Sequence, residues 1–336
     1  MQDKIIKFSR DISFISTASA VGKKESEGAV GDCFDIHDNT DRFGKNTWEK
    51  AESEMQRLAL NVALSKAGLS EKDIDALFAG DLLNQCVGSA YGLLDFDIPY
   101  FGLYGACSTA VEGIILASMG VSAGHFDRCA AVTSSHNSSA ERQYRAPIEY
   151  GSQRAPTAQW TVTGSGAFII GAEGKGVRIK EAMPGIVVDK GINDAGNMGA
   201  AMAPAVISTL VRYFKASGTS PEDFDLILTG DLGFEGSSIL CDLICSEGYD
   251  LKNRQNDCGM IIYDRERQDM HAGGSGCGCS AVILASYIMP KLLRGELSDI
   301  LVIGTGAMMS PASIQQGESI PSVAHLVRLE SPSKTN

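Results

Sequence analysis

Apolar residues recur at helical spacing between residues 50 and 66, in the sequence KAESEMQRLALNVALSK. Polar and charged residues fill the intervening positions, which is the pattern of a helix with one buried face. Gly68 is placed where a helix commonly ends, and Ser70 begins a second short turn before the apolar run at 76–79. The stretch therefore predicts an amphipathic helix on the outside of the fold, leading into a strand.

Two other helical stretches have no polar face. Residues 108–122 contain Glu112 as their only charge, and residues 278–290 contain no charge. Because such helices must be covered on all sides, we expect both to lie between sheets. The strand runs at 130–135 (AAVTSS) and 300–306 (ILVIGTG) are continuously apolar or small, as in strands buried on both faces. Together these features predict an α/β sandwich of five layers, αβαβα, since two separate three-layer domains would leave the apolar helices in water.

The chain contains two similar halves. DALFAGDL at 75–82 returns as DLILTGDL at 225–232, and CSTAVEGIILAS at 107–118 returns as GCGCSAVILAS at 276–286. The matching segments occur in the same order, which predicts an internal duplication. We place the boundary in the glycine-rich, charged stretch 171–180, so that residues 1–173 form the N-terminal half and residues 174–336 the C-terminal half. The N-terminal half carries an insert at about 134–160.

Charge and cysteine content exclude several classes of protein. The formal net charge of −12 argues against a nucleic-acid surface, which needs a basic stripe. The sequence shows no N-terminal leader and no apolar run of about 20 residues, so we expect a soluble, cytoplasmic chain, peripheral to a membrane at most. The nine cysteines are odd in number and scattered, which indicates reduced thiols. Cys277, Cys279 and His271 lack a fourth ligand and the usual zinc spacing, so we expect no metal site.

One cysteine occupies a position suited to catalysis. Cys107 lies in YGACSTAVEGI at 104–114, where an apolar run gives way to the first buried helix. Unpaired N–H groups and the positive end of the dipole at a helix start lower the pKa of a thiol and favour the thiolate. A small core residue is the alternative, but the glycine before the turn favours a place in a pocket. The pattern predicts a nucleophile or the remnant of one.

Four segments resemble the thiolase superfamily, which includes thiolases and β-ketoacyl synthases. They are AGLSEKDIDALFAG (67–80), GACSTAVEGI (105–114), WTVTGSGAFIIG (160–171) and GGSGCGCSA (273–281). The resemblance covers nearly the entire chain. It implies a duplicated, thiolase-like form of the five-layer sandwich with two buried central helices, assembled as a homodimer.

A narrower resemblance is to the stage V sporulation protein AD family of spore-forming bacteria. It is carried by the Cys107 turn, by SSHNSSAERQYRAPIEYGSQRAPTAQWTVTGSGA (134–167), by GDLG (230–233) and by GTGAMMSPASIQQGESIPSVAHLV (304–327). This resemblance implies a protein that binds dipicolinic acid, pyridine-2,6-dicarboxylate. Membrane proteins of the same sporulation operon are its implied partners in loading the calcium chelate of the acid, and the implied place is the forespore or spore inner membrane.

The resemblance also bears on whether Cys107 is active. Condensing enzymes of the superfamily carry histidines, or a histidine and an asparagine, beside this cysteine. At the matching positions this chain has Asp231 in TGDLG and the segment HAGGSGCGC, from which only His271 could reach the pocket. Each missing base or oxyanion donor typically costs about 100-fold in rate. We therefore favour an inherited binding pocket that needs no cofactor over an acyltransferase that loads Cys107 from a coenzyme A thioester.

A dianion such as dipicolinate calls for guanidinium groups, neutral donors and an apolar or aromatic slot. The insert follows a strand end of the kind where α/β proteins bind ligands, and it supplies His136, Asn137, Arg142, Arg145 and Arg154. Arginine is also enriched in interfaces, so a dimer contact is an equal alternative. The backbone at Gly274 and Ser275 opens the second buried helix and forms another candidate contact, or serves tight packing. Calcium would enter with the ligand and would reduce the need for positive charge.

Overall fold

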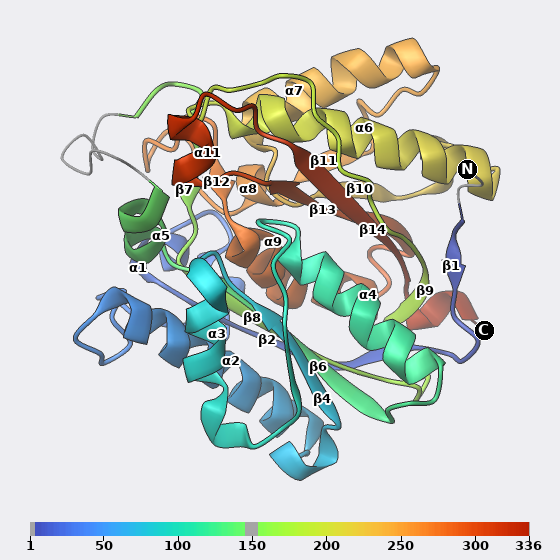
Figure 1. Cartoon of the computed structure of the whole chain (residues 1–336). Helices are drawn as coiled ribbons and strands as arrows, with labels where there is room; N and C mark the ends of the chain where they lie inside the picture. Colours follow the sequence, from blue (N-terminus) through green and yellow to red (C-terminus); the bar gives the residue numbers. More distant parts are fainter. Residues whose placement is uncertain (1–3, 145–153, 336) are drawn as a thin grey trace.

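Two sets of five strands repeat one topology in the computed structural model, which describes residues 4–144 and 154–335 (Figure 1). In sheet order the first set is β5 (Tyr100–Gly102), β4 (Ala76–Gly80), β6 (Arg128–Ser135), β8 (Gly164–Gly171) and β2 (Ser13–Val21). The second set is β11 (Gln255–Asp257), β10 (Leu226–Thr229), β13 (Asp299–Ala307), β14 (Ser322–Glu330) and β9 (Arg178–Met183). In each set the first three strands are parallel and the two later pairings are antiparallel.

The two sets join at β2 and β9, where Ser13 pairs with Arg178. Short strands extend this junction, since β1 (Ile6–Lys7) pairs with β9 and β3 (Ile36–His37) with β2. The repeat extends to local detail: the 3₁₀ turns η2 (Glu71–Asp73) and η6 (Pro221–Asp223) each have a capping box formed with the preceding serine. The repeated sequence segments therefore adopt the same local structure twice.

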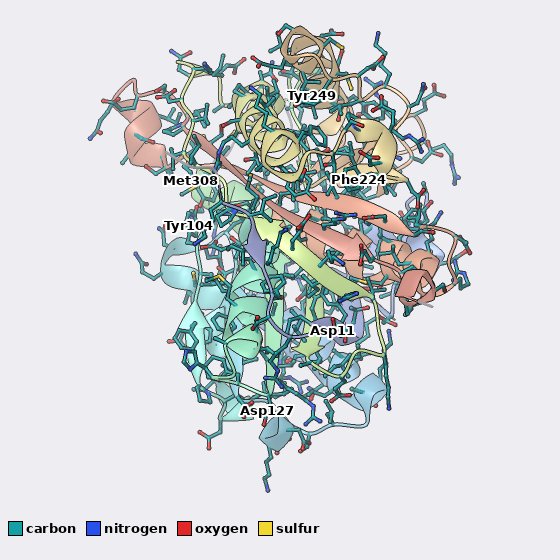
Figure 2. All side chains as sticks on the ribbon, turned by 90° about the vertical axis from the view of Figure 1, so that its right-hand side faces the viewer. Asp11, Tyr104, Asp127, Phe224, Tyr249 and Met308 are labelled. Atoms are coloured by element: carbon teal, nitrogen blue, oxygen red, sulfur yellow. The ribbon has the colours of Figure 1, made fainter. Side chains whose placement is uncertain are left out.

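Helices cover both faces of both sets of strands. They are α2 (Trp48–Ala67), α4 (Thr109–Ser122), α6 (Met198–Ser217), α7 (Gly233–Ile244) and α9 (Cys277–Ile283). Along β13, Ile300 and Val302 pack in a central cluster with α4 and α9, whereas Leu301 and Ile303 pack under α6. β6 alternates in the same way between the centre and α2, as expected for strands buried on both faces. Figure 1 shows α4 and α9 between the two sets of strands. In Figure 2, Phe224 and Tyr249 lie in the second half and Asp127 lies at the opposite end of the molecule.

The helix predicted over residues 50–66 is confirmed as α2, which is slightly longer at both ends. Thr47 caps its start, and Gly68 ends it with a φ of 67°, where glycine meets no steric penalty. α9 is buried at every residue, whereas α4 exposes Met119 near its end. The second buried helix is also less regular than the sequence predicts: α9 passes through a π-helical turn at Leu284–Ile288 into α10 (Met289–Leu293).

The predicted insert contains α5 (Asn137–Tyr144) and β7 (Trp160–Thr161). β7 pairs in parallel with β12 (Gly274–Ser275), which connects the insert to the start of α9. The remaining short helices are α1 (Lys23–Ser26), α3 (Val87–Gly92), α8 (Cys258–Ile261) and α11 (Pro311–Gln315). The remaining 3₁₀ turns are η1 (Gly31–Cys33), η3 (Asn84–Cys86), η4 (Leu94–Phe96), η7 (Cys245–Glu247) and η9 (Pro332–Thr335).

Candidate functional site: a cavity beside Cys107

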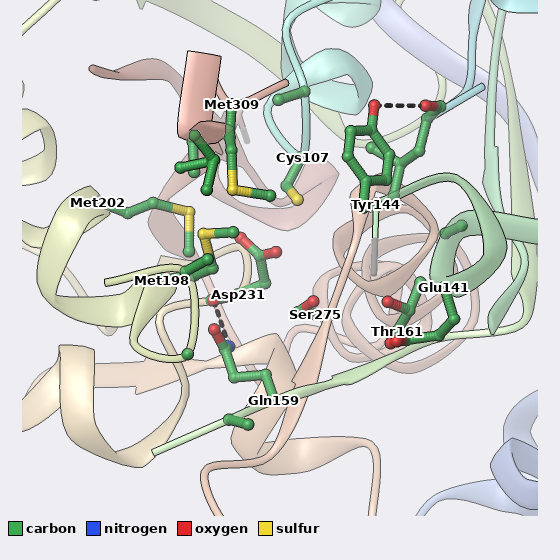
Figure 3. Close-up of a pocket in the computed structure, with 18 of the residues that line it drawn as sticks. Cys107, Glu141, Tyr144, Gln159, Thr161, Met198, Met202, Asp231, Ser275 and Met309 are labelled. Carbon is green, nitrogen blue, oxygen red and sulfur yellow. Dashed lines mark hydrogen bonds between the residues drawn. The ribbon is translucent and has the colours of Figure 1, made fainter. Parts of the chain in front are cut away.

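A cavity of about 420 Å³ lies between the two halves, with Cys107 and Asp231 among its lining residues (Figure 3). Its polar and aromatic lining consists of Tyr104, Cys107, Glu141, Tyr144, Gln159, Thr161, Asp231 and Ser275. Its larger apolar lining consists of Leu82, Met198, Met202, Met309 and Ile314. The walls come from the insert, from the starts of α4 and α6, and from the ends of β10 and β13, so both halves build the site.

The turn that carries Cys107 is held by local hydrogen bonds. Ser108 Oγ donates to Gly105 O over 2.6 Å, and Thr109 Oγ1 donates to Ala106 O over 2.7 Å. Ala106 has a φ of 50°, an uncommon conformation for a residue with a side chain. Such a strained residue beside a cavity indicates that the position of the next residue, Cys107, is fixed by the surrounding fold.

Asp231 follows β10, is 1% exposed and is held on both carboxyl oxygens. Thr305 Oγ1 donates to Oδ1 over 2.5 Å, and the N–H of Gly276 donates to Oδ2 over 2.8 Å. Burial raises the pKa of Asp231 to about 7, although its hydrogen bonds from Thr305 and from the N–H of Gly276 act in the opposite direction. The site therefore holds a carboxyl group that gains or loses its proton near neutral pH.

The thiol of Cys107 is not activated by its place before α4. Desolvation raises its pKa well above the ordinary value, and the charge of Asp231 and the neighbouring Cys277 raise it further. The N–H of Gly276 acts in the opposite direction but does not outweigh them. Burial of the sulfur, together with the carboxyl group of Asp231, therefore outweighs the lowering of the pKa that the helix start alone would give. Cys107 is a neutral thiol at physiological pH.

His271 and Arg154 do not line the cavity, and both side chains contact Asp269. His271 Nδ1 lies 3.1 Å from Ala155 O, and its Nε2 lies 3.2 Å from Asp269 Oδ1. Arg154 donates to Asp269 O over 2.9 Å, and its guanidinium lies 5.2 Å from the ring centre of Trp160. Both side chains therefore contact the exposed Asp269 rather than the cavity.

The other predicted contacts in the insert are also directed elsewhere. His136 is fully buried, with Nε2 2.8 Å from Asp41 O. Asn137 donates its backbone N–H to Thr163 Oγ1 over 3.1 Å, and its side chain does not line the cavity. Arg142 forms an ion pair with Glu49 on α2. Arg145 lies outside the described residues.

The other predicted contact region was the backbone at Gly274 and Ser275, and only one of these two residues lines the cavity. Ser275 lines the cavity, whereas Gly274 packs in the β7–β12 ladder and accepts a hydrogen bond from Gln159 Nε2 over 3.0 Å. The sequence did not indicate four other lining residues: Gln159, Thr161, Met198 and Met202. Gln159 lies inside the predicted insert and Thr161 directly follows it, which was a signal, whereas the positions of Met198 and Met202 depend on contacts between distant segments.

The described residues form neither a metal-binding cluster nor a membrane-spanning helix. Within residues 4–144 and 154–335, no group of three or more His, Cys, Asp or Glu side chains is placed to hold a metal ion. No helix in this part of the chain is long and apolar enough to cross a membrane.

Comparison with known proteins decides the family. The model of the family described as "Stage V sporulation protein AD" matches residues 2–330 of this chain. The chain belongs to this family. It is also 45% identical, over 96% of its length and 95% of the relative's, to the stage V sporulation protein AD of Bacillus subtilis (strain 168). The predicted resemblance is confirmed, and the chain is a homologue of a sporulation protein.

Solved structures show that the fold is shared more widely. A variant of OleA from Xanthomonas campestris matches with a TM-score of 0.61 at 14% identity, over 96% of this chain and 99% of that one. The 3-oxoacyl-[acyl-carrier-protein] synthase III of Aquifex aeolicus matches with a TM-score of 0.59 at 12% identity, over 95% and 99%. At such low identity these matches show the fold alone. They confirm the α/β class and its resemblance to condensing enzymes.

Proposed function

We propose that the cavity beside Cys107 binds dipicolinic acid as its calcium chelate, and that the chain serves the loading of this complex into the developing spore. One observation carries the proposal. The cavity retains a cysteine at the start of a buried helix, but the described residues around it include no histidine and place Asp231 against the sulfur. Family membership supplies the link to the spore.

The size and lining of the cavity suit a small aromatic acid. A volume of about 420 Å³ lies within the usual range for sites that bind small molecules. Met198, Met202 and Met309 offer adaptable apolar side chains for a ring, and Tyr144 borders the opposite wall (Figure 3). Tyr104 also lines the cavity, with its hydroxyl 2.7 Å from that of Tyr144. Neutral hydroxyl groups supply hydrogen bonds.

The charges of the lining favour the chelate over the free dianion. Asp231 and Glu141 are acidic, and none of the lining residues in the described parts of the chain is Lys, Arg or His. A dianion would meet like charge in a poorly solvated cavity, which is costly. Calcium neutralises the two carboxylates of dipicolinate, so the neutral chelate avoids this cost.

Acyl transfer through Cys107 is the second candidate, and one observation favours it. The N–H of Gly276 acts to lower the pKa of the Cys107 thiol, as a donor that stabilises an anion does. A thiol with a raised pKa and no histidine in the described lining is nevertheless a poor nucleophile. Incubation with acetyl- or malonyl-coenzyme A should leave the intact mass of the protein unchanged. An adduct that disappears in Cys107→Ala would establish the acyltransferase instead.

Calorimetry with a blocked cavity tests the binding proposal. Ala158 lines the cavity and is half-buried, so Ala158→Trp should fill the space and abolish saturable binding of calcium dipicolinate. Ala123, exposed at the end of α4, provides the matched control Ala123→Trp, which should bind like the natural chain. Equal binding by both variants would place the ligand elsewhere. No saturable heat from the natural chain, with or without calcium, would refute the function.

We also propose a homodimer formed through β5. This strand lies at the end of the sheet, with its three residues exposed and its outer edge unpaired within the described chain. Tyr100, Phe101 and Tyr104 are 39%, 47% and 40% exposed, which is unusual for three aromatic residues so close in sequence. A second copy pairing edge to edge would extend the sheet and cover them.

The membrane partners rest on the family alone. We propose that membrane proteins of the same sporulation operon hold the chain at the forespore or spore inner membrane. Fractionation of sporulating cells tests this: the chain should sediment with membranes when those proteins are present and should leave the membrane fraction when they are deleted.

A further inference from the structure

We infer that the hydroxyl groups of Thr161 and Ser275 together form the subsite that holds one carboxylate of the ligand. This inference rests on the function proposed above and names the contact that would recognise the acid.

The two residues come from distant parts of the chain but are direct neighbours in the fold. Thr161 in β7 and Ser275 in β12 are register partners of a parallel pair, so their side chains leave the ladder on the same face. Both line the cavity, and Figure 3 shows Thr161 next to Glu141 and Ser275 between Thr161 and Asp231. Neighbouring strands are about 4.8 Å apart, which allows two adjacent hydroxyls to donate to the two oxygens of one carboxylate.

Both hydroxyls lack a partner within residues 4–144 and 154–335. This distinguishes them from the other uncharged donors of the cavity. The amide nitrogen of Gln159 already donates to Asp231 O over 2.6 Å and to Gly274 O over 3.0 Å, which uses both of its protons. The hydroxyl of Tyr144 donates to Leu82 O over 2.7 Å, and the hydroxyl of Tyr104 lies 2.7 Å from that of Tyr144. Since Tyr144 has used its only proton, Tyr104 donates to it.

The ladder fixes the two hydroxyls before a ligand arrives. Trp160 donates its N–H to Gly273 O over 2.9 Å, and Val162 donates to Ser275 O over 2.8 Å. Gly276 follows Ser275 with a φ of 99°, and a side chain there would lie 2.6 Å from Ser135 Oγ and 3.4 Å from Thr161 Cγ2. The methyl group of Thr161 therefore packs toward Gly276. Because the two side chains are already fixed, binding an anion costs little further side-chain entropy.

Neutral donors also fit the charge of the site. A chelated carboxylate keeps lone pairs directed away from the calcium ion, and those lone pairs accept hydrogen bonds. Hydroxyls can supply these bonds without attracting the free dianion, whereas a lysine or arginine would attract it. The pair thus selects a carboxylate whose charge is already neutralised.

The test compares variants that remove or keep each hydroxyl. Thr161→Val and Ser275→Ala should each weaken binding of calcium dipicolinate by about tenfold in calorimetry, since hydrogen bonds to charged groups contribute at this level. Thr161→Ser and Ser275→Thr keep the donors and should bind within about threefold of the natural chain. Ser13→Ala is the matched control, because Ser13 Oγ is buried, unpartnered and outside the cavity.

Each outcome separates this inference from the proposed function. Binding unchanged in Thr161→Val and Ser275→Ala, with a natural chain that binds, overturns the hydroxyl subsite and leaves the function standing. Equal loss in the hydroxyl-keeping variants would assign the effect to shape and would also overturn it. A natural chain without saturable binding removes the proposed function, and the subsite with it. Thermal unfolding of every variant shows whether a loss of binding reflects a loss of fold.

Discussion

The carboxyl group of Asp231 lies beside the thiol of Cys107 in the cavity, and it accepts a hydrogen bond from the N–H of Gly276 over 2.8 Å. In a condensing enzyme the cysteine needs a neighbouring base that accepts its proton and so produces the thiolate. Here its neighbour is a buried acid whose negative charge opposes ionisation of the sulfur. Under the proposed function, this relationship lets a fold shared with condensing enzymes serve as a binding site.

Replacing Asp231 should make Cys107 more reactive. Asp231→Asn removes the negative charge, so the pKa of the thiol should fall, although burial keeps it above its ordinary value. Alkylation of Cys107 by iodoacetamide near pH 8, followed by peptide mass spectrometry, should accelerate by up to about tenfold, equivalent to one pKa unit.

Asp269→Asn is the matched control for this experiment, because Asp269 is exposed and interacts with Arg154 and His271 instead. Its alkylation rate should equal that of the natural chain. An unchanged rate in Asp231→Asn would mean that the carboxyl group does not control the thiol.

Buried acids should make the protein less stable as pH rises. Glu52 on α2 is 1% exposed, and burial together with the charge of Asp81 raises its pKa to about 8. Between about pH 5 and 8 the unfolded chain releases a proton that the folded chain keeps, so the free energy of unfolding falls with pH. The slope for this group is at most about 1.4 kcal/mol per pH unit, and it flattens above about pH 8.

Glu52→Gln should remove the part of the pH dependence of the free energy of unfolding that comes from this carboxyl group. Denaturant unfolding between about pH 5 and 8 measures the change. Glu54→Gln, on the same helix, is the control: Arg57 lowers the pKa of Glu54, so that group is ionised in both states over the whole window. The control curve should run parallel to that of the natural chain. A Glu52→Gln curve that also runs parallel would show that Glu52 carries no proton in the folded protein.

A charge on the β5 edge should break the proposed dimer. Leu77 donates to Pro99 O just before β5, and Leu103 just after β5 donates to Ala79 O. Because alternate residues of a parallel strand bond to one neighbour, the backbone of Tyr100 faces outward. Tyr100→Glu would place like charges on two edges meeting across a two-fold axis. Light scattering during gel filtration should show a dimer for the natural chain and a monomer for this variant.

Leu243→Glu makes the same kind of change at an exposed residue of α7 and should remain dimeric. A monomeric natural chain, or a Tyr100→Glu variant that stays dimeric, would contradict an assembly through β5.

The sequence predicted best those features that depend on local pattern. α2 follows from helical spacing and from Gly68, and the turn at Cys107 follows from its small residues before an apolar helix. Repeated segments predicted which strands correspond. These elements needed no knowledge of distant contacts, because periodicity and end signals are properties of the nearby chain.

The site was less predictable, because distant contacts decide it. Asp81 and Asp231 occupy equivalent places in the repeat, yet Asp81 accepts hydrogen bonds from Ser89 and Leu83 whereas Asp231 lines the cavity with Cys107. No pattern in either half separates these two roles. Arg142 has the chemistry for an anion but pairs with Glu49 from α2. The pairing of Thr161 with Ser275 depends on a short ladder between segments far apart in sequence, a type of contact that hydrophobic patterning does not reveal.

A crystal structure of the protein soaked with calcium dipicolinate tests the central claim most directly. We predict one chelate in the cavity beside Cys107, its ring against the methionine wall, one carboxylate on Thr161 and Ser275, and an unmodified sulfur. An empty cavity with the ligand bound at Arg142 or Arg154, or a sulfur that carries an acyl group, would contradict it.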